Sequence, residues 1–137
     1  MTFANNMPFP VADTEIQKTE AKLGIQFPES FRRAMMASNG GEILTDDDAW
    51  TQYPFLDESD RKRLPRTCND IVKETLSAKE WEGFPGQGVA IACNECGDHL
   101  LLLPSKEDGA VLSETIYTFR HEDGQVEPLT GSITELK

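Results

Sequence analysis

The chain contains one pattern typical of a metal site, Cys93-x-x-Cys96-x-x-His99. Thiolates and imidazoles are good zinc ligands, and the tip of a β-hairpin can present two cysteines to one ion. A structural zinc site needs four ligands, and the two residues that could complete the set, Cys68 and His121, lack motif spacing. The alternative is that Cys93 packs in the core, Cys96 belongs to a turn and His99 lies on the surface of a strand. We favour this alternative and expect no metal and no cofactor.

No other spacing in the sequence points to catalysis. The serines lack the Gly-x-Ser-x-Gly context of a nucleophile. The glycines of Asn39-Gly40-Gly41 end a predicted helix rather than precede one, so they do not form a cradle for phosphate. His99 and His121 could lie on neighbouring strands, but chance explains that placement equally well. We therefore expect a protein that is not an enzyme.

The bulk composition is that of a single soluble domain. The chain has 137 residues, of which 38% are hydrophobic and 27% are charged, and this is enough apolar material for one core. No run approaches the roughly 18 apolar residues of a membrane span, and the N-terminus lacks the pattern of a signal peptide. An odd number of cysteines argues against a disulfide framework. We expect a cytoplasmic protein that has no membrane partner.

The formal charge of −11 is unevenly distributed along the chain. Residues 80–137 carry eleven acidic and three basic side chains, whereas residues 1–79 carry thirteen and ten. An acidic surface disfavours direct binding to nucleic acid and attracts a basic protein. The alternative is that the charge only keeps the protein soluble, and we weigh the two equally. The basic stretch 61–66 could dock an acidic partner, but we prefer a solvated loop beside its own acidic residues.

The first half of the chain predicts an extended lead-in and two helices. Residues 1–12 have no hydrophobic period and contain two prolines, as a lead-in would. A first helix should begin at the capping box Thr14-x-x-Gln17 and end at Gly24, which suits a left-handed C-terminal position. A second helix should have Pro28 as its first residue and stop at Asn39-Gly40-Gly41.

Glu20 occupies a position on the first helix where an apolar residue is expected, between Ile16 and Leu23. It is either a buried acid with a functional role or a structural carboxylate. A structural carboxylate would accept backbone N–H groups near the Gly24 corner or the Asn39–Gly41 turn, because a buried carboxylate must find such donors. We favour the structural interpretation.

The second half of the chain predicts one more helix and a series of strands. Residues 67–81 form the helix, capped by Thr67 or Asn69. Strands follow at 89–93, with one packed face, and at 99–103, with both faces buried. A further strand at 115–120, an Asp-Gly turn and a last strand confined to an edge by Pro128 precede a short terminal helix. This order favours a single α+β domain with helices on one face of a mainly antiparallel sheet.

Several of these features together resemble the SUKH superfamily, the Smi/Knr-like proteins. The first is the run Glu20-x-x-Leu23-Gly24-x-x-Phe27-Pro28-x-x-Phe31, which ends in Asn39-Gly40-Gly41; Phe27 departs from the leucine that is commoner there. The strand before Gly97-Asp98, the leucine run after it and Ile116-Tyr117-x-Phe119 are also similar. The resemblance covers residues 13–137, preceded by the lead-in 1–12, and implies a curved sheet. It implies structural roles for Glu20, Leu23, Gly24, Pro28, Phe31, Asn39, Gly40, Gly41 and Gly97.

The resemblance also implies a function, since the superfamily includes bacterial immunity proteins and a fungal cell-wall regulator. We expect a protein-binding module that neutralises a basic, nuclease-type toxin by occluding its active site. The alternative is an adaptor for a signalling or cell-envelope partner. Two aromatic residues, Trp50 and Tyr53, could anchor the partner, although we favour core positions for both. The expected contact residues, these two included, are Asp46, Asp47, Asp48, Trp50, Tyr53, Glu95, Asp98, Glu107, Asp108, Glu122 and Asp123.

Overall fold

A computed structural model describes residues 9–45, 48–59 and 61–136, and its first two helices meet at a tight corner. Helix α2 (Asp13–Leu23) ends at Gly24, whose φ of 71° is the predicted left-handed conformation. The predicted capping box is wrong, because α2 begins at Asp13 and no side chain caps its start. Gln17 instead donates a hydrogen bond to Asp13 inside the helix.

The Glu20 carboxylate closes the corner between α2 and the next helix, α3 (Glu29–Ala37). Its Oε2 accepts a hydrogen bond from the Phe27 N–H at 2.8 Å, which is the backbone bond expected near Gly24. The guanidinium of Arg32 pairs with the same oxygen and with Asp13. Pro28 is extended and precedes α3 instead of being its first residue. The corner is thus held by a carboxylate that bridges backbone and side-chain donors.

The Asn39 side chain fixes the chain just after α3, because it makes two hydrogen bonds to one backbone residue, as a neighbouring strand would. Asn39 accepts a hydrogen bond from the Phe55 N–H at 2.8 Å and donates one to the Phe55 carbonyl at 2.9 Å. Gly40 and Gly41 follow with φ values of 108° and 97° and lead into the first strand. The residues of α3 that face inward, Phe31 and Met35, are buried as their spacing predicts.

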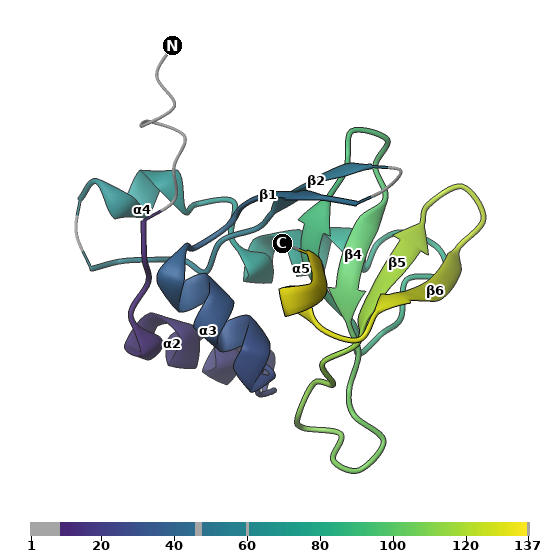
Figure 1. The fold of residues 1–137 in the computed structure, drawn as a ribbon, viewed down its shortest axis with the longest axis horizontal. Coiled ribbons are helices and arrows are strands. Elements are labelled where there is room, and N and C mark those ends of the chain that lie inside the picture. Colours follow the sequence, from purple (N-terminus) through teal and green to yellow (C-terminus); the bar gives the residue numbers. More distant parts are fainter. Residues whose placement is uncertain (1–8, 46–47, 60, 137) are drawn as a thin grey trace.

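Six strands form one antiparallel sheet in which each strand pairs with its neighbours along the chain (Figure 1). The strands are β1 (Gly41–Leu44), β2 (Ala49–Gln52), β3 (Val89–Cys93), β4 (His99–Leu102), β5 (Ile116–Arg120) and β6 (Gln125–Thr130). Pro128 lies on β6, which is an edge strand as predicted. A 3₁₀ helix, η1 (Ile133–Leu136), packs against α3. The predicted single α+β domain is therefore confirmed.

The central strands β3 and β4 are buried on both faces. The prediction for β4 is correct, but that for β3 is wrong, because every residue from Val89 to Ala92 is buried. The cover on the face that carries His99 comes from Phe84, in the segment after α5 (Ile71–Ala78). Its ring lies 5.2 Å from the Phe119 ring and 6.2 Å from that of His99.

Helix α5 supplies a hydrogen-bond partner to the part of β3 that lies beyond its pairing with β2. The Thr75 hydroxyl accepts a hydrogen bond from the Ala90 N–H at 3.0 Å and lies 3.5 Å from the Ala90 carbonyl. The helix is shorter than predicted, and its cap is Asp70, which accepts a bond from the Lys73 N–H. Leu76, on this helix, is 60% exposed. None of the described helices is long and apolar enough to span a membrane.

The end of the predicted lead-in, from Phe9 onward, and the basic stretch meet beside α3, whereas residues 1–8 lie outside the described part of the chain. The Phe9 carbonyl accepts a hydrogen bond from the Asn39 N–H. The guanidinium groups of Arg63 and Arg66, on the short helix α4 (Arg63–Arg66), lie 4.9 and 4.6 Å from the centre of the Phe9 ring. These two arginines therefore cover an aromatic ring of the same chain, which supports the preference against a docking patch.

Candidate partner-binding surface

Three of the hairpin connections meet at one end of the sheet. They are the β1–β2 loop, the β3–β4 turn and the β5–β6 turn, while the long β4–β5 loop lies at the opposite end (Figure 1). Of the predicted contact residues, the structure brings five to the shared end: Asp48, Glu95, Asp98, Glu122 and Asp123. Glu107 and Asp108 lie on the β4–β5 loop and do not join them, and Asp46 and Asp47 lie outside the described residues.

Asp98 is the internal brace of this end rather than a contact residue. It is 7% exposed, and its Oδ1 accepts bonds from the His121 backbone N–H at 3.2 Å and the His121 ring at 2.7 Å. Its Oδ2 accepts bonds from Arg120 at 2.9 Å and from Asn94 at 3.2 Å. Since these donors occupy both oxygens, we remove Asp98 from the expected contacts.

The hydrogen-bond donors around Asp98 set the direction of its pKa shift. Burial alone would raise the pKa of Asp98. The hydrogen bonds from His121, Arg120 and Asn94 outweigh burial and lower this pKa from 3.8 to about 2. The ionised carboxylate therefore holds the β3–β4 turn to the end of β5.

A second carboxylate and a glycine complete the connection between the tips. Asp48, on the β1–β2 loop, accepts a bond from the Asn94 side chain at 2.7 Å and lies 3.9 Å from the Arg120 guanidinium. Gly97 has a φ of 92°, which favours glycine, and a Cβ there would lie 3.6 Å from the His121 ring. The three tips thus hold one another in place.

Trp81 is the residue of this end that sequence reasoning missed. It follows α5, is 47% exposed, and its ring lies 5.4 Å from that of His121. The contact depends on Gly83, where a Cβ would lie only 2.9 Å from Gly124 Cα in the β5–β6 turn. The sequence carries no local signal for this, because packing between distant segments decides it. We define the tip surface as Asp48, Glu95, Glu122, Asp123 and Trp81.

The two predicted aromatic anchors lie in the core instead. Trp50 is 1% exposed, and its indole N–H donates to Thr45 Oγ1. Tyr53 is 7% exposed, and its hydroxyl lies 3.2 Å from His99 Nδ1. Neither ring is therefore part of the tip surface, in agreement with the core positions that we favoured for both.

The buried pair of Tyr53 and His99 also bears on the metal pattern. Burial raises the pKa of Tyr53 and lowers the pKa of His99. The expectation of a surface position for His99 is wrong, because it is buried and one of its ring nitrogens faces Tyr53. Cys96 is exposed in the turn and Cys93 is half-buried. Among the described residues, no three His, Cys, Asp or Glu side chains are placed to share a metal ion.

Comparison with known proteins identifies the family. A family model described as the SMI1 / KNR4 family (SUKH-1) matches residues 10–136, nearly the whole chain. Searches among curated proteins and among solved structures returned no significant match. Domains of this family are protein-binding modules and are generally non-catalytic. The chain therefore belongs to the SMI1/KNR4 family (SUKH-1), as its N-terminal run and its Gly-Asp hairpin predict.

Proposed function

We propose that this protein is an immunity module that binds a basic, nuclease-type toxin through the tip surface and occludes its active site. The observation that supports the proposal most strongly is the gathering of acidic side chains from three hairpin tips at one end of the sheet, where the exposed Trp81 packs on His121. The family supports a binding role, and the surface suggests the charge of the partner.

The charge of the surface matches the chemistry of a nuclease site. Such a site must be basic to hold phosphate, so an inhibitor that presents clustered carboxylates can occupy the same field. Opposite charges raise association rate constants toward about 10⁸–10⁹ M⁻¹s⁻¹ at low salt, against about 10⁵–10⁶ M⁻¹s⁻¹ without steering. Tryptophan is among the residue types that contribute most to binding energy at the centre of interfaces. Trp81 would then be the anchor and the carboxylates the steering groups.

The bracing of the tips lowers the cost of binding. Loops that order only on association lose conformational entropy, which subtracts from affinity. Here the bonds of Asp98 and Asp48 fix the three tips before any partner arrives. A specific interface of about 1,600 Å² in total is larger than the five residues of the tip surface, so neighbouring parts of the tips would contribute as well.

A pull-down from native lysate at low and high salt, followed by mass spectrometry, tests the proposal. The bait is the wild-type chain, compared with a triple variant of the tip surface, Glu95→Lys, Glu122→Lys and Asp123→Lys. A matched triple variant of the β4–β5 loop, Glu107→Lys, Asp108→Lys and Glu114→Lys, changes the net charge equally at the other end.

We expect one basic partner with a nuclease-type domain, which wild type and the loop variant retain at low salt and the tip variant loses. An acidic or neutral partner from signalling or envelope assembly would favour the adaptor alternative. A partner that the loop variant alone loses would move the interface to the opposite end of the sheet. Both results would contradict the assignment of the tip surface.

A further inference from the structure

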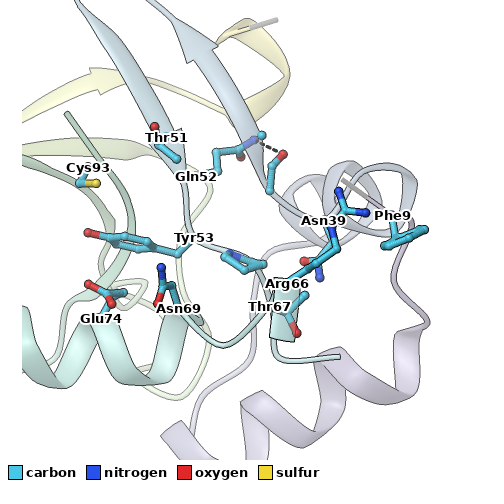
Figure 2. A pocket seen from close by; sticks show the side chains of 13 residues that line it. Phe9, Asn39, Thr51, Gln52, Tyr53, Arg66, Thr67, Asn69, Glu74 and Cys93 are labelled. Atoms are coloured by element: carbon cyan, nitrogen blue, oxygen red, sulfur yellow. Dashed lines mark hydrogen bonds between the residues drawn. The ribbon is translucent and has the colours of Figure 1, made fainter. Parts of the chain in front are cut away.

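A cavity of about 520 Å³ lies away from the tip surface, where β2 ends and the chain turns toward α5. Its size is in the range of sites that hold small molecules or side chains of a partner. Figure 2 shows Tyr53, Asn69, Glu74 and Cys93 at one end and Phe9, Asn39, Arg66 and Thr67 at the other, with Gln52 between them.

The amide of Gln52 leaves one hydrogen-bonding atom unused in the wall of this cavity. Gln52 is 4% exposed, and its Nε2 donates to the Gly40 carbonyl at 2.9 Å. Its Oε1 is buried and has no partner within the described part of the chain. An unsatisfied buried acceptor is unfavourable, so a donor that reached Gln52 Oε1 from the cavity would gain this bond at little desolvation cost.

Glu74 supplies a second acceptor at one end of the cavity. It is half-buried on α5, and its carboxylate makes no hydrogen bond or ion pair with the described residues. It lies close enough to Tyr53 to act electrostatically on that hydroxyl. A half-buried carboxylate without a counter-charge favours a cation with several N–H donors.

The other end of the cavity carries the cationic side chain of Arg66, which orients a ligand. The Arg66 guanidinium stacks over the Phe9 ring there. A cationic group is therefore repelled from the Arg66 end and attracted to the Glu74 end. The Glu74 end also presents the Tyr53 ring, and a planar guanidinium, which is weakly hydrated and stacks on aromatic rings, suits such a wall better than an ammonium.

We infer that this cavity binds an arginine residue of a polypeptide, with its guanidinium at Glu74 and Tyr53 and its main-chain N–H at Gln52 Oε1. The inference deepens the proposed function, because a basic partner carries such residues, and it rests on that function only for the identity of the polypeptide. The binding step itself involves no partner and can be tested with the isolated chain.

The test is an NMR titration of the ¹⁵N-labelled full chain with N-acetyl-L-arginine amide, which offers a guanidinium and main-chain N–H groups without terminal charges. N-acetyl-L-citrulline amide is the matched ligand, because it has nearly the same shape and no charge. The variant Glu74→Gln removes the counter-charge, and Glu114→Gln is a control at an exposed acidic residue outside the cavity. The side-chain amide signals of Gln52 report occupation directly.

We expect saturable shifts of the Gln52 side-chain signals with the arginine compound. Binding should be about tenfold weaker for citrulline, and for arginine with Glu74→Gln, since a charge-assisted bond is lost in each case. Glu114→Gln should bind as wild type does. Because the citrulline comparison uses the wild-type chain, it stands even if Glu74→Gln does not fold.

Three results would overturn the inference: no saturable shift of Gln52, equal affinity for arginine and citrulline, or shifts confined to the tip surface. Tighter binding of free L-arginine than of the blocked compound would assign the cavity to a small molecule and overturn the polypeptide part. None of these results bears on the pull-down, which tests the tip surface and can fail or succeed separately.

Discussion

Replacing Asp98 by asparagine removes the charge that braces the three hairpin tips and keeps the shape of the side chain. The ionised carboxylate accepts bonds from Asn94, Arg120 and His121. The fall in its pKa from 3.8 to about 2 corresponds to about 2 kcal/mol of folding free energy, at about 1.4 kcal/mol per pKa unit. An asparagine amide also turns an N–H group toward one of these donors. We therefore expect Asp98→Asn to lower the free energy of unfolding by about 2–3 kcal/mol at pH 7.

The direction of the Asp98 pKa shift predicts how the free energy of unfolding changes with pH. The pKa of Asp98 is lower in the folded than in the unfolded protein, so its contribution is complete above the unfolded value of 3.8. The contribution is lost as the pH falls from 3.8 toward about 2, because the unfolded chain binds the proton first. The wild type should thus lose stability in this window, and Asp98→Asn should lose less, so the two curves converge at low pH.

Urea unfolding, followed by tryptophan fluorescence from pH 7 to pH 2, measures both quantities. Asp123→Asn is the matched control, because Asp123 lies at the same end, is exposed and accepts a bond from the Gln125 N–H. It should change the free energy of unfolding by less than about 0.5 kcal/mol. A loss for Asp98→Asn that is small, or that stays constant across the acidic window, would refute the bracing role.

Three further predictions concern the corner, the edge of β3 and the buried histidine. Glu20→Ala should cost about 3 kcal/mol in urea unfolding, because it leaves the Phe27 N–H without its acceptor and the Arg32 guanidinium with Asp13 alone; a loss near zero would contradict its structural role. Thr75→Val should cost about 2 kcal/mol, because the Ala90 N–H loses its partner, and the exposed neighbour change Ser77→Ala should be nearly neutral. The pKa of His99 is lowered by burial, so its contribution is present above about 6.5 and lost as the pH falls below that value. Melting temperatures from pH 8 to pH 5 should fall less for His99→Gln than for wild type, and equal slopes would argue against a neutral buried ring.

Features fixed by local chemistry were predictable from the sequence. Gly24 follows a periodic helix, and only a left-handed conformation ends the helix there without strain. Pro128 lacks an N–H, which confines its strand to an edge. The Leu100–Leu102 run is too apolar for an exposed face. In each case the residue restricts the backbone or the burial by itself, whatever its distant neighbours.

Features fixed by distant contacts were not predictable. Thr67, Asn69 and Asp70 are all of residue types that cap helices. Asp70 caps α5 because the N–H of Ile71 donates to the Pro54 carbonyl, which sets where the helix begins. Thr75 lies within the predicted helix 67–81, but its bond to the backbone of β3 depends on where β2 ends, which the local sequence does not show.

The arrangement of the tip surface was likewise not predictable from local sequence. Four of the expected contact residues share one end of the sheet, and this placement follows from strand register over the whole sheet: Asp48, Glu95, Glu122 and Asp123. Asp98 is an acidic residue close to Glu95 in the sequence, but it has a different role. Its donors His121 and Arg120 come from another hairpin, so the local sequence does not show that role. No sequence pattern separates a bracing carboxylate from a contacting one.

The rate of association with the captured partner tests the role of the tip surface most directly. Stopped-flow measurements at several ionic strengths would compare wild type, the tip variant and the β4–β5 loop variant. We expect the wild-type rate constant to fall steeply with salt, and the tip variant to associate at least about tenfold more slowly at low salt with a flatter dependence. The loop variant should stay close to wild type. Equal rates for the tip variant and wild type, with a slower loop variant, would contradict binding through the tip surface.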